Sequence, residues 1–420
     1  MNQKIFALID CNAFYVSCER VFNPKLNNRP VVALSNNDGC IIARSKEAKS
    51  LGIKMGVPLF KVKDIIQKEK VIVFSSNYTL YADMSRRVMN VISEFAPSIE
   101  IYSIDEAFIE LTGFKLDYED YARNLRATIL RCTGIPVSIG IGTTKTLAKV
   151  ANHIAKDNET LGGICSLVDM KNIDNTLEQT KVEEVWGIGR QLSKKLIHQG
   201  VHNAKLLKYS DDQWIRKMMS INGLKTVTEL RGISCLPLQE VSVTRKSCCT
   251  TRTFGKPLMK LADVEQAMTT FARRATERIR SEGLVASSVS AFLRTSPFDR
   301  GNKYYSNSDS VALHHPTCDT ITVVHSALSV VKRIFKEGYK YKKGGILLSG
   351  FYTKGTEPPS LFSSSKSESQ DLMLTIDNIN QRYGSDTIQM ASECYTAKWK
   401  QKRKNCTQSY TTQVSKLLLI

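Results

Sequence analysis

Two acidic residues stand side by side inside an apolar run, and no other feature constrains this 420-residue chain as strongly. Residues 101–109 read Ile-Tyr-Ser-Ile-Asp-Glu-Ala-Phe-Ile, which places the acids at Asp105 and Glu106. A charge beside so much apolar surface is costly unless an opposite charge neutralises it. Because two adjacent carboxylates also repel each other, the run points to a bound divalent cation.

A third acid supports this interpretation. Asp10 ends a second strongly apolar segment, residues 5–9, which predicts a buried strand. Magnesium prefers oxygen ligands and usually takes only a few of them from protein, which leaves positions for substrate phosphates. Three carboxylates at the ends of buried strands therefore predict a magnesium site. The alternative is that Asp105 and Glu106 occupy an ordinary solvated turn, where most acidic residues are found.

The charge of the chain is strongly positive and unevenly distributed. Lys and Arg number 59 against 40 Asp and Glu, a net charge of +19 that favours a polyanionic partner. Residues 231–350 hold 19 basic and 9 acidic side chains, more than half of the excess. A focused basic region is typical of binding to a nucleic-acid backbone. The alternative is a basic surface without that role.

Several other classes of protein are disfavoured by composition. No apolar stretch approaches the roughly 18 to 20 residues that span a bilayer. The N-terminus lacks a small-residue cleavage site, so a signal peptide is not expected. The 11 cysteines are scattered and form no Cys-x-x-Cys motif, so neither a disulfide framework nor a zinc site is expected. A reducing cytoplasm is the expected location.

Hydrophobic periodicity predicts a multidomain α+β chain. Up to residue 165 the order strand, helix, strand-turn-strand, helix, strand indicates a ferredoxin-like sheet with helices on one face, interrupted by an insertion over 24–75. Helix-capping signals stand at Asn77, at Ser45 and at either Thr143 or Thr144.

The second half of the chain changes in character twice. Short helices are expected over residues 166–230. Strands at 285–294 and 346–352 accompany a basic helix over 264–279. From residue 353, Gly, Pro and Ser indicate a flexible C-terminal tail.

Three ordered motifs carry a family resemblance. Residues 10–15 read Asp-Cys-Asn-Ala-Phe-Tyr, residues 102–108 read Tyr-Ser-Ile-Asp-Glu-Ala-Phe, and residues 138–142 read Ser-Ile-Gly-Ile-Gly before a lysine-rich helix. The chain thereby resembles the Y-family (lesion-bypass) DNA polymerases. Residues 35–40 and 74–78 are similar to the UmuC-like branch, the catalytic subunits of bacterial DNA polymerase V.

This resemblance implies a domain plan. It gives a palm over 1–23 and 76–165, fingers over 24–75, and a thumb with a helix-hairpin-helix over 166–231. A DNA-binding little finger covers 242–350, and a tail for partner interactions covers 351–420.

The resemblance also implies a catalytic centre. Asp10, Asp105 and Glu106 would hold two magnesium ions, helped by the Cys11 carbonyl, and the substrates would be deoxynucleoside triphosphates. In such a two-metal site the metals position the attacking and leaving groups. Tyr15 would exclude ribonucleotides, unless it is simply a core aromatic.

Other residues would contact the nucleotide. The resemblance places Phe14 beside Tyr15, and Lys49 and Lys156 at the triphosphate, with Arg44 in reserve. Lys46 and Lys49 stand where relatives often carry Tyr and Arg, and Lys cannot reproduce the bidentate fork of Arg.

Further positions would contact the base pair or the DNA. Ile42 and Gly56 would roof the nascent base pair, although Gly56 could be a turn glycine. The hairpin glycines Gly187 and Gly189 would approach a DNA phosphate.

Basic side chains complete the expected DNA contacts. Arg245, Lys246 and Arg252 would grip DNA from the little finger. Lys145 and Lys149 either line a solvated helix face or contact phosphates.

The implied function is error-prone, template-directed DNA synthesis past lesions in the SOS response, without proofreading, in the bacterial cytoplasm and associated with the nucleoid. Implied partners are primer-template DNA, the cleaved UmuD dimer, RecA, and the sliding clamp through a degenerate peptide at Leu361-Phe362. Two alternatives stay open. A nucleotidyl cyclase shares such a sheet and metal-binding acids but needs no basic DNA-gripping domain. A non-catalytic DNA-binding protein would not need three intact acids.

Overall fold

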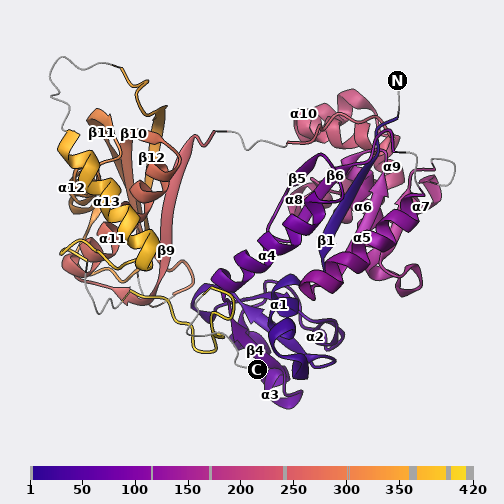
Figure 1. The fold of residues 1–420 in the computed structure, drawn as a ribbon, viewed down its shortest axis with the longest axis horizontal. Helices are drawn as coiled ribbons and strands as arrows, with labels where there is room; N and C mark the ends of the chain where they lie inside the picture. The colour runs from indigo at the N-terminus through magenta and orange to yellow at the C-terminus, as the bar shows by residue number, and fades with distance from the viewer. Residues whose placement is uncertain are drawn as a thin grey trace. The chain divides into compact units, whose positions relative to one another are not determined.

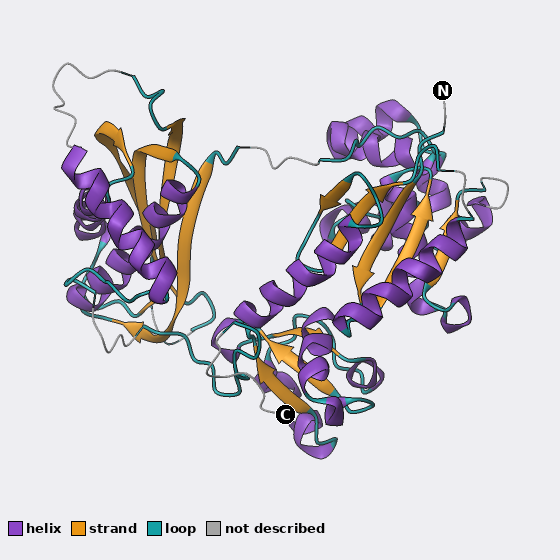
Figure 2. Cartoon of the chain, viewed as in Figure 1, coloured by secondary structure: helices purple, strands orange, loops and turns teal. Residues whose placement is uncertain are grey.

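The computed structural model describes residues 3–114, 117–169, 173–239, 244–299, 301, 303–358, 367–393 and 399–412. The chain forms two compact units. Met1–Ser35, Gly39–Ser242 and Asn405–Ile420 form the first, and Asn36–Asp38 with Val243–Lys404 form the second. Both units combine helices with sheets, as the sequence predicts (Figures 1 and 2). Within the described ranges, no helix has the length and apolar content that crossing a membrane requires.

A five-stranded sheet forms the centre of the first unit, in the order β5-β6-β1-β7-β8. Strand β1 runs antiparallel to both β6 and β7, and β8 runs parallel to β7. The order of the first four strands is that of a ferredoxin-like fold. The strands are β1 (Phe6–Cys11), β5 (Ile99–Ile101), β6 (Glu106–Glu110), β7 (Val137–Gly142) and β8 (Ile164–Leu167).

Helices cover both faces of this sheet, which corrects the expectation of one covered face. Ala7 and Ile9 of β1 pack in the core shared with α4 (Tyr78–Ser93) and α5 (Tyr118–Thr133). The alternate residue Leu8 faces α6 (Lys145–Asp157), where it packs with Ala148. A Cβ at Gly140 would overlap the backbone of α6, so this glycine in β7 allows the helix to lie directly on the sheet.

Polar side chains begin three of the helices, as the sequence predicts. Asn77 accepts a hydrogen bond from the Leu80 N–H at 3.3 Å and caps α4. Ser45 caps α2 (Lys46–Ser50). Of the two candidates before α6, Thr144 is the cap, because its hydroxyl accepts from the Leu147 N–H at 3.1 Å. Each cap satisfies a backbone donor that has no partner inside its helix.

The insertion after the first helix forms a small sheet with its own core. Strand β2 lies between β3 and β4, antiparallel to the first and parallel to the second. Its core includes Leu34, Ile41 and Ile53. The elements of this region are α1 (Phe14–Phe22), β2 (Val31–Leu34), β3 (Ile41–Arg44), α2, α3 (Lys63–Lys68) and β4 (Ile72–Ser75), with short 3-10 turns η1 (Pro24–Leu26) and η3 (Leu59–Val62). The 3-10 turn η2 (Asn36–Asp38) follows β2 in the sequence but belongs to the second unit.

Short helices follow β8 and pack against α6. Leu147 and Val150 of α6 share a core with Leu177, Leu196 and Val227 of these helices. The elements are α7 (Ile173–Gln179), α8 (Arg190–His198), α9 (Ala204–Lys208) and α10 (Asp212–Leu230), with 3-10 turns η4 (Glu159–Leu161) and η6 (Val182–Glu184). Helix α6 is therefore held between the sheet and the helical region.

The second unit is a four-stranded antiparallel sheet, β11-β10-β12-β9, with two helices packed on one face. The expected basic helix is α11 (Leu261–Ser281), and the expected strands are β10 (Leu284–Thr295) and β12 (Tyr341–Thr353). The structure adds β9 (Ser247–Leu258), β11 (Ser306–Thr317) and α12 (Thr320–Ile334). Strand β11 lies at the sheet edge and begins with a polar run, which makes its sequence signal weak.

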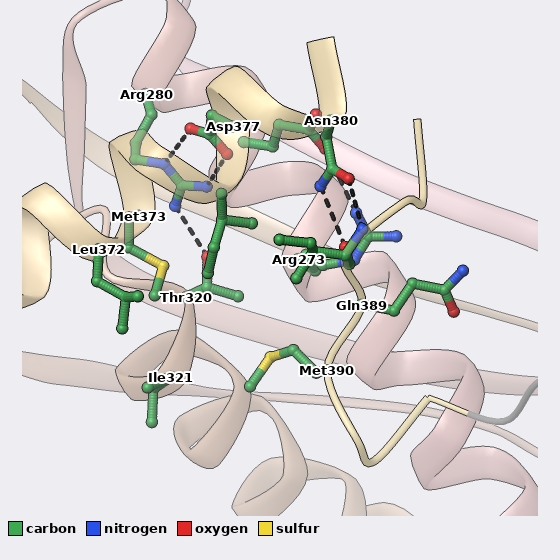
Figure 3. Close-up of a pocket in the computed structure, with 13 residues that line it drawn as sticks. Arg273, Arg280, Thr320, Ile321, Leu372, Met373, Asp377, Asn380, Gln389 and Met390 are labelled. Carbon is green, nitrogen blue, oxygen red and sulfur yellow. Dashed lines mark hydrogen bonds and ion pairs between the residues drawn. The ribbon is translucent and has the colours of Figure 1, made fainter. Parts of the chain in front are cut away.

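The C-terminal region contains a packed helix where the sequence indicated a flexible tail. Helix α13 (Ser367–Tyr383) lies on α11, and the Asp377 carboxylate accepts two hydrogen bonds from the Arg280 guanidinium at 2.7 and 2.8 Å (Figure 3). Arg273 pairs with Glu393 and Asp386 nearby. These ion pairs join residues about a hundred positions apart, so local sequence patterns could not indicate them.

Candidate active site

Strand pairing brings the three predicted acids to one end of the central sheet. Asp10 at the end of β1 lies directly opposite Glu106 at the start of β6. The turn before β6 carries Asp105, whose carbonyl accepts a hydrogen bond from the Cys11 N–H at 2.9 Å. The Ser103 hydroxyl donates to Asp105 Oδ1 at 2.6 Å. The acidic pair thus lies in a turn of defined geometry beside Asp10.

The acids share this end of the sheet with two lysines from α6. Lys156 Nζ lies 2.5 Å from Asp10 Oδ2, and Lys149 Nζ lies 3.3 Å from Glu106 Oε1. Burial raises the pKa of Asp10 to about 7, against the opposing effect of Lys156, and the neighbouring Glu106 raises it further. The Lys156 ammonium group therefore does not fully offset the burial of Asp10, which favours additional positive charge at this position.

The donor set fits magnesium. Asp10, Asp105 and Glu106 supply only carboxylate oxygens, the ligands that Mg²⁺ prefers. The Cys11 side chain is buried in the core, so a contact from this residue would use its carbonyl. Among the described residues, no three acidic, His or Cys side chains are already arranged around one ion position, and Asp10 and Glu106 contact lysines instead.

Tyr15 lies on an aromatic platform beside the acids. Its half-buried ring stacks on Tyr81 of α4 with the centroids 4.4 Å apart and the planes 14° apart. The ring of Tyr78 meets it edge-on at 6.2 Å. Phe14, the other predicted nucleotide contact, is buried in the core. Tyr15 is therefore held by packing on one face and keeps part of its surface accessible.

The basic candidates from the insertion reach the end of α6. Lys49 Nζ lies 3.5 Å from Asp157 Oδ1, and the exposed Lys46 pairs with Glu159. Arg44 instead donates to the Ile53 carbonyl within the small sheet. Because Asp157 follows Lys156 directly, Lys49 approaches the same end of α6 as the other triphosphate candidate.

Lys145 and Lys149 are not on a solvated helix face, so that alternative is wrong for both. Lys145 is only 2% exposed, pairs with Glu100 and donates to the Pro237 carbonyl at 2.8 Å. Lys149 lies 4.5 Å from the centroid of the Tyr102 ring, next to Glu106. The helix on which they lie is covered by the helical region, which its lysine-rich sequence does not indicate.

An aromatic cluster beside Glu106 was not predicted. The indole N–H of Trp186 donates to the Tyr102 hydroxyl at 3.1 Å, and Lys149 also lies over the indole at 5.3 Å. Trp186 directly precedes the hairpin glycines, so the hairpin is attached to the turn that carries the acids. Trp186 and Tyr102 are 84 positions apart in the sequence. The only sequence signal for this contact is that Tyr102 lies inside one of the family motifs.

The candidate glycines differ in what their positions require. Gly187 has φ +89°, a conformation that L side chains rarely adopt. Gly189 caps α8 with ordinary extended backbone and open space around its Cα. Gly56 has φ +75° in an open turn, which agrees with the turn-glycine alternative. Ile42 is half-buried on β3.

The basic candidates of the second unit have different surroundings. Lys246 is exposed, whereas Arg245 makes two hydrogen bonds to Glu282 at 2.7 and 2.9 Å. Arg252 shares the side of β9 that carries Cys248 and Phe254, which is the side that packs against the helices. Its contact with DNA stays a prediction.

A separate pocket of about 210 Å³ lies in the second unit. Leu372 and Met373 of α13 and Ile321 of α12 contribute apolar surface, and Arg273 and Arg280 close one side (Figure 3). None of its lining residues belongs to the acidic cluster. The pocket is therefore distinct from the candidate active site.

The fold is that of a Y-family DNA polymerase. A solved Y-family DNA polymerase chimera superposes with a TM-score of 0.66 at 20% identity and covers 82% of this chain and 98% of its own. The order of β5, β6, β1 and β7, with the acids at their ends, is the part of that fold on which the site depends.

Sequence comparisons identify the family. Residues 9–153 match the impB/mucB/samB family and residues 245–361 match its C-terminal domain, while residues 370–420 match a domain of unknown function, DUF4113. Protein UmuC of Salmonella typhimurium is 42% identical over 99% of this chain and all of that relative. Protein MucB of Escherichia coli is 38% identical, and a DNA polymerase IV of Desulfatibacillum aliphaticivorans is 25% identical, each over more than 90% of both chains. The chain belongs to the impB/mucB/samB family.

Proposed function

We propose that this polymerase copies DNA past damaged template bases and adds each deoxynucleotide at Asp10, Asp105 and Glu106. The observation that carries the proposal is the convergence of these three carboxylates at one end of the central sheet, within reach of two lysines. Membership of the impB/mucB/samB family supports error-prone translesion synthesis in the SOS response. Phosphoryl transfer needs little covalent chemistry from protein, so residues that position charge do most of the work.

Asp10, Asp105 and Glu106, with the Cys11 carbonyl, would hold two magnesium ions. Magnesium bound there would lower the pKa of the primer hydroxyl and offset charge on the leaving pyrophosphate. Lys156 exchanges its contact with Asp10 for a contact with the triphosphate, and Lys49 grips the same group from the insertion. Lys149 stays beside Glu106, where the Tyr102 and Trp186 rings fix its position.

Tyr15 selects the sugar. Its ring is fixed against Tyr81, so it cannot move away from a nucleotide sugar placed over its exposed edge. A 2′-hydroxyl would then meet the ring, and ribonucleotides are rejected by steric exclusion.

The second unit binds the DNA backbone. By strand alternation, the side of its sheet away from α11 and α12 carries the hydroxyl residues Thr251, Ser290 and Ser310 together with Lys343. Small hydroxyl side chains allow a close approach, and the net charge of +10 over residues 231–350 attracts phosphate. The hairpin at Gly187 and Gly189 supplies backbone N–H groups to a second stretch of backbone.

The proposed partners are primer-template DNA and, because of the family to which the chain belongs, the cleaved UmuD dimer and RecA. The proposed location is the bacterial cytoplasm. The sliding clamp is a further candidate, but its proposed peptide at Leu361-Phe362 lies outside the described residues.

Primer extension with magnesium tests the assignment. Templated addition of deoxynucleotides is expected, whereas production of a cyclic nucleotide would favour a cyclase, and neither product would favour a non-catalytic protein. Asp105→Ala and Glu106→Ala should each abolish extension. Near-normal extension by either variant would overturn the metal-binding assignment.

A further inference from the structure

The C-terminal segment, defined as residues 405–412, packs within the first unit against β4 and against α1, the helix that carries Tyr15. The Ser75 N–H donates to the Asn405 carbonyl at 3.0 Å, and the Asn405 N–H donates back to the Ser75 hydroxyl at 3.0 Å. Further along, the ring of Tyr410 stacks on Phe22 of α1 with the centroids 4.8 Å apart. The segment is therefore anchored both to β4 and to α1.

Asn77 ties the middle of this segment to the start of α4. Its amide donates to the Gln408 carbonyl at 3.0 Å and to the Thr407 hydroxyl at 3.1 Å. Its carbonyl oxygen meanwhile caps the helix through the Leu80 N–H. One buried side chain thus fixes the position of Thr407 relative to α4.

Thr407 belongs to a continuous chain of contacts that ends at Tyr15. The Thr407 hydroxyl donates to Glu19 Oε1 at 3.2 Å, and the Tyr81 hydroxyl donates to the same oxygen at 2.7 Å. Tyr81 then stacks directly against Tyr15. Glu19 lies on α1, the helix that also carries Tyr15, so the carboxylate joins the C-terminal segment to both sides of the aromatic platform.

Glu19 depends strongly on these donors. The side chain is 1% exposed, and its Oε2 has no hydrogen-bond partner in the described part of the chain. A buried polar group that loses a partner costs more than the hydrogen bond itself gained. Burial also raises the pKa of Glu19, which agrees with a poorly compensated carboxylate. Loss of the Thr407 hydroxyl would let Glu19 shift, and Tyr81 would shift with it.

We propose that the C-terminal segment positions the Tyr15 sugar gate through Thr407, Glu19 and Tyr81. The inference rests on the proposed role of Tyr15 and names a regulator of its selectivity. It gives the end of the matched domain of unknown function a defined task. Thr407 and Glu19 are positioning residues, because neither needs to touch the nucleotide.

Single-nucleotide insertion by the full chain on primer-template DNA tests the proposal. The readout is the ratio of kcat/KM for a deoxynucleoside triphosphate to that for the matching ribonucleoside triphosphate. Thr407→Val, which keeps the shape and removes the hydroxyl, should lower this ratio about fivefold, corresponding to ~1 kcal/mol. Thr407→Ser should restore it. Gln408→Ala is the matched control, because its exposed side chain is removed and its carbonyl stays.

A second donor gives an independent variant. Tyr81→Phe removes the other hydroxyl on Glu19 and should also lower the ratio. The double variant should lose less than the sum of the two single losses, because both hydroxyls act through one carboxylate. If these variants lose sugar selectivity while their KM for the deoxynucleotide stays near normal, the residues position Tyr15 and the substitutions have not damaged the active site in general. If Thr407→Val does not fold, Thr407→Ala and Tyr81→Phe provide the same measurement.

The outcomes separate this inference from the function on which it rests. Tyr15→Ala serves as the reference and should admit ribonucleotides. If Tyr15→Ala lowers the ratio but Thr407→Val and Tyr81→Phe leave it unchanged, the positioning role is overturned and the gate stands. If Tyr15→Ala has no effect, the gate and the inference both fail. A loss in Gln408→Ala equal to that in Thr407→Val would also overturn the role of the hydroxyl.

Discussion

Glu229 of α10 accepts two hydrogen bonds from Thr146 at the start of α6, from its N–H at 2.9 Å and from its hydroxyl at 3.0 Å. The other carboxylate oxygen accepts the N–H groups of Cys235 and Leu236 at 3.1 and 3.0 Å. Glu229 is fully buried. A negative charge at the N-terminus of a helix is also favourable for the helix dipole. This single side chain therefore joins the helical region to the helix that carries Lys149 and Lys156.

Replacing Glu229 by Gln should destabilise the first unit. The glutamine carries no charge, and its NH2 group must face either the N–H and hydroxyl of Thr146 or the N–H groups of Cys235 and Leu236. At least two charge-assisted hydrogen bonds are therefore lost. We expect a fall of about 2–4 kcal/mol in the free energy of unfolding. Denaturant unfolding monitored by tryptophan fluorescence measures it. Glu178→Gln, in an exposed ion pair with Lys205, is the control and should change little; an equal loss in both variants would contradict the role of Glu229.

The buried ion pair between Lys145 and Glu100 gives a second prediction. Glu100 also accepts the Gln239 N–H at 2.7 Å, so both charges are buried in a hydrogen-bonded network. Lys145→Met leaves Glu100 without its counter-charge and should cost about 3–5 kcal/mol. Glu100→Leu combined with Lys145→Met should cost less than the sum of the two single substitutions. Thermal unfolding of the wild type, the two single variants and the double variant completes this double-mutant cycle. If the two losses of stability simply add, the two charges do not interact.

The direct contact between β7 and α6 predicts that Gly140 tolerates no side chain. A Cβ would overlap the Asn152 N–H and the Ala148 carbonyl of α6, both of them backbone groups that cannot rotate away. Gly140→Ala should therefore cost about 1–3 kcal/mol or more by overpacking, and displacement of α6 should also weaken nucleotide binding through Lys156. Gly189→Ala is the stability control, because nothing lies near its Cα and its backbone is ordinary. A melting temperature of Gly140→Ala equal to that of the wild type would contradict this direct packing of α6 on β7.

Residue patterns indicated the parts of the fold that depend on local chemistry. The caps at Asn77 and Ser45, the strand ending at Asp10 and the acidic turn at Asp105 were all predicted, because each has a signal within a few residues. Glu229 was not, since a glutamate near a helix end reads as solvated until its distant partner is known. The same applies to Lys145, which lies on a lysine-rich helix. Its ammonium group is buried by contacts with residues about 45 and 90 positions away in the sequence. Helix α13 was likewise not predicted, because its Asp377 pairs with Arg280, which lies 97 positions earlier in the chain.

The last prediction concerns the attachment of α13 to the second unit. Arg280 is almost fully buried and binds Asp377 through two hydrogen bonds (Figure 3). It also donates to the Cys318 carbonyl at 2.7 Å. Asp377→Arg places two guanidinium groups together and should release the helix, because the repulsion adds to the loss of a buried pair. Hydrogen exchange should then become much faster in α13 and remain unchanged in β10. Asp371→Arg reverses an exposed charge on the same helix and should leave exchange as in the wild type. The double variant Arg280→Asp with Asp377→Arg should restore part of the protection, and equal exchange in Asp377→Arg and Asp371→Arg would show that α13 is held by its apolar contacts alone.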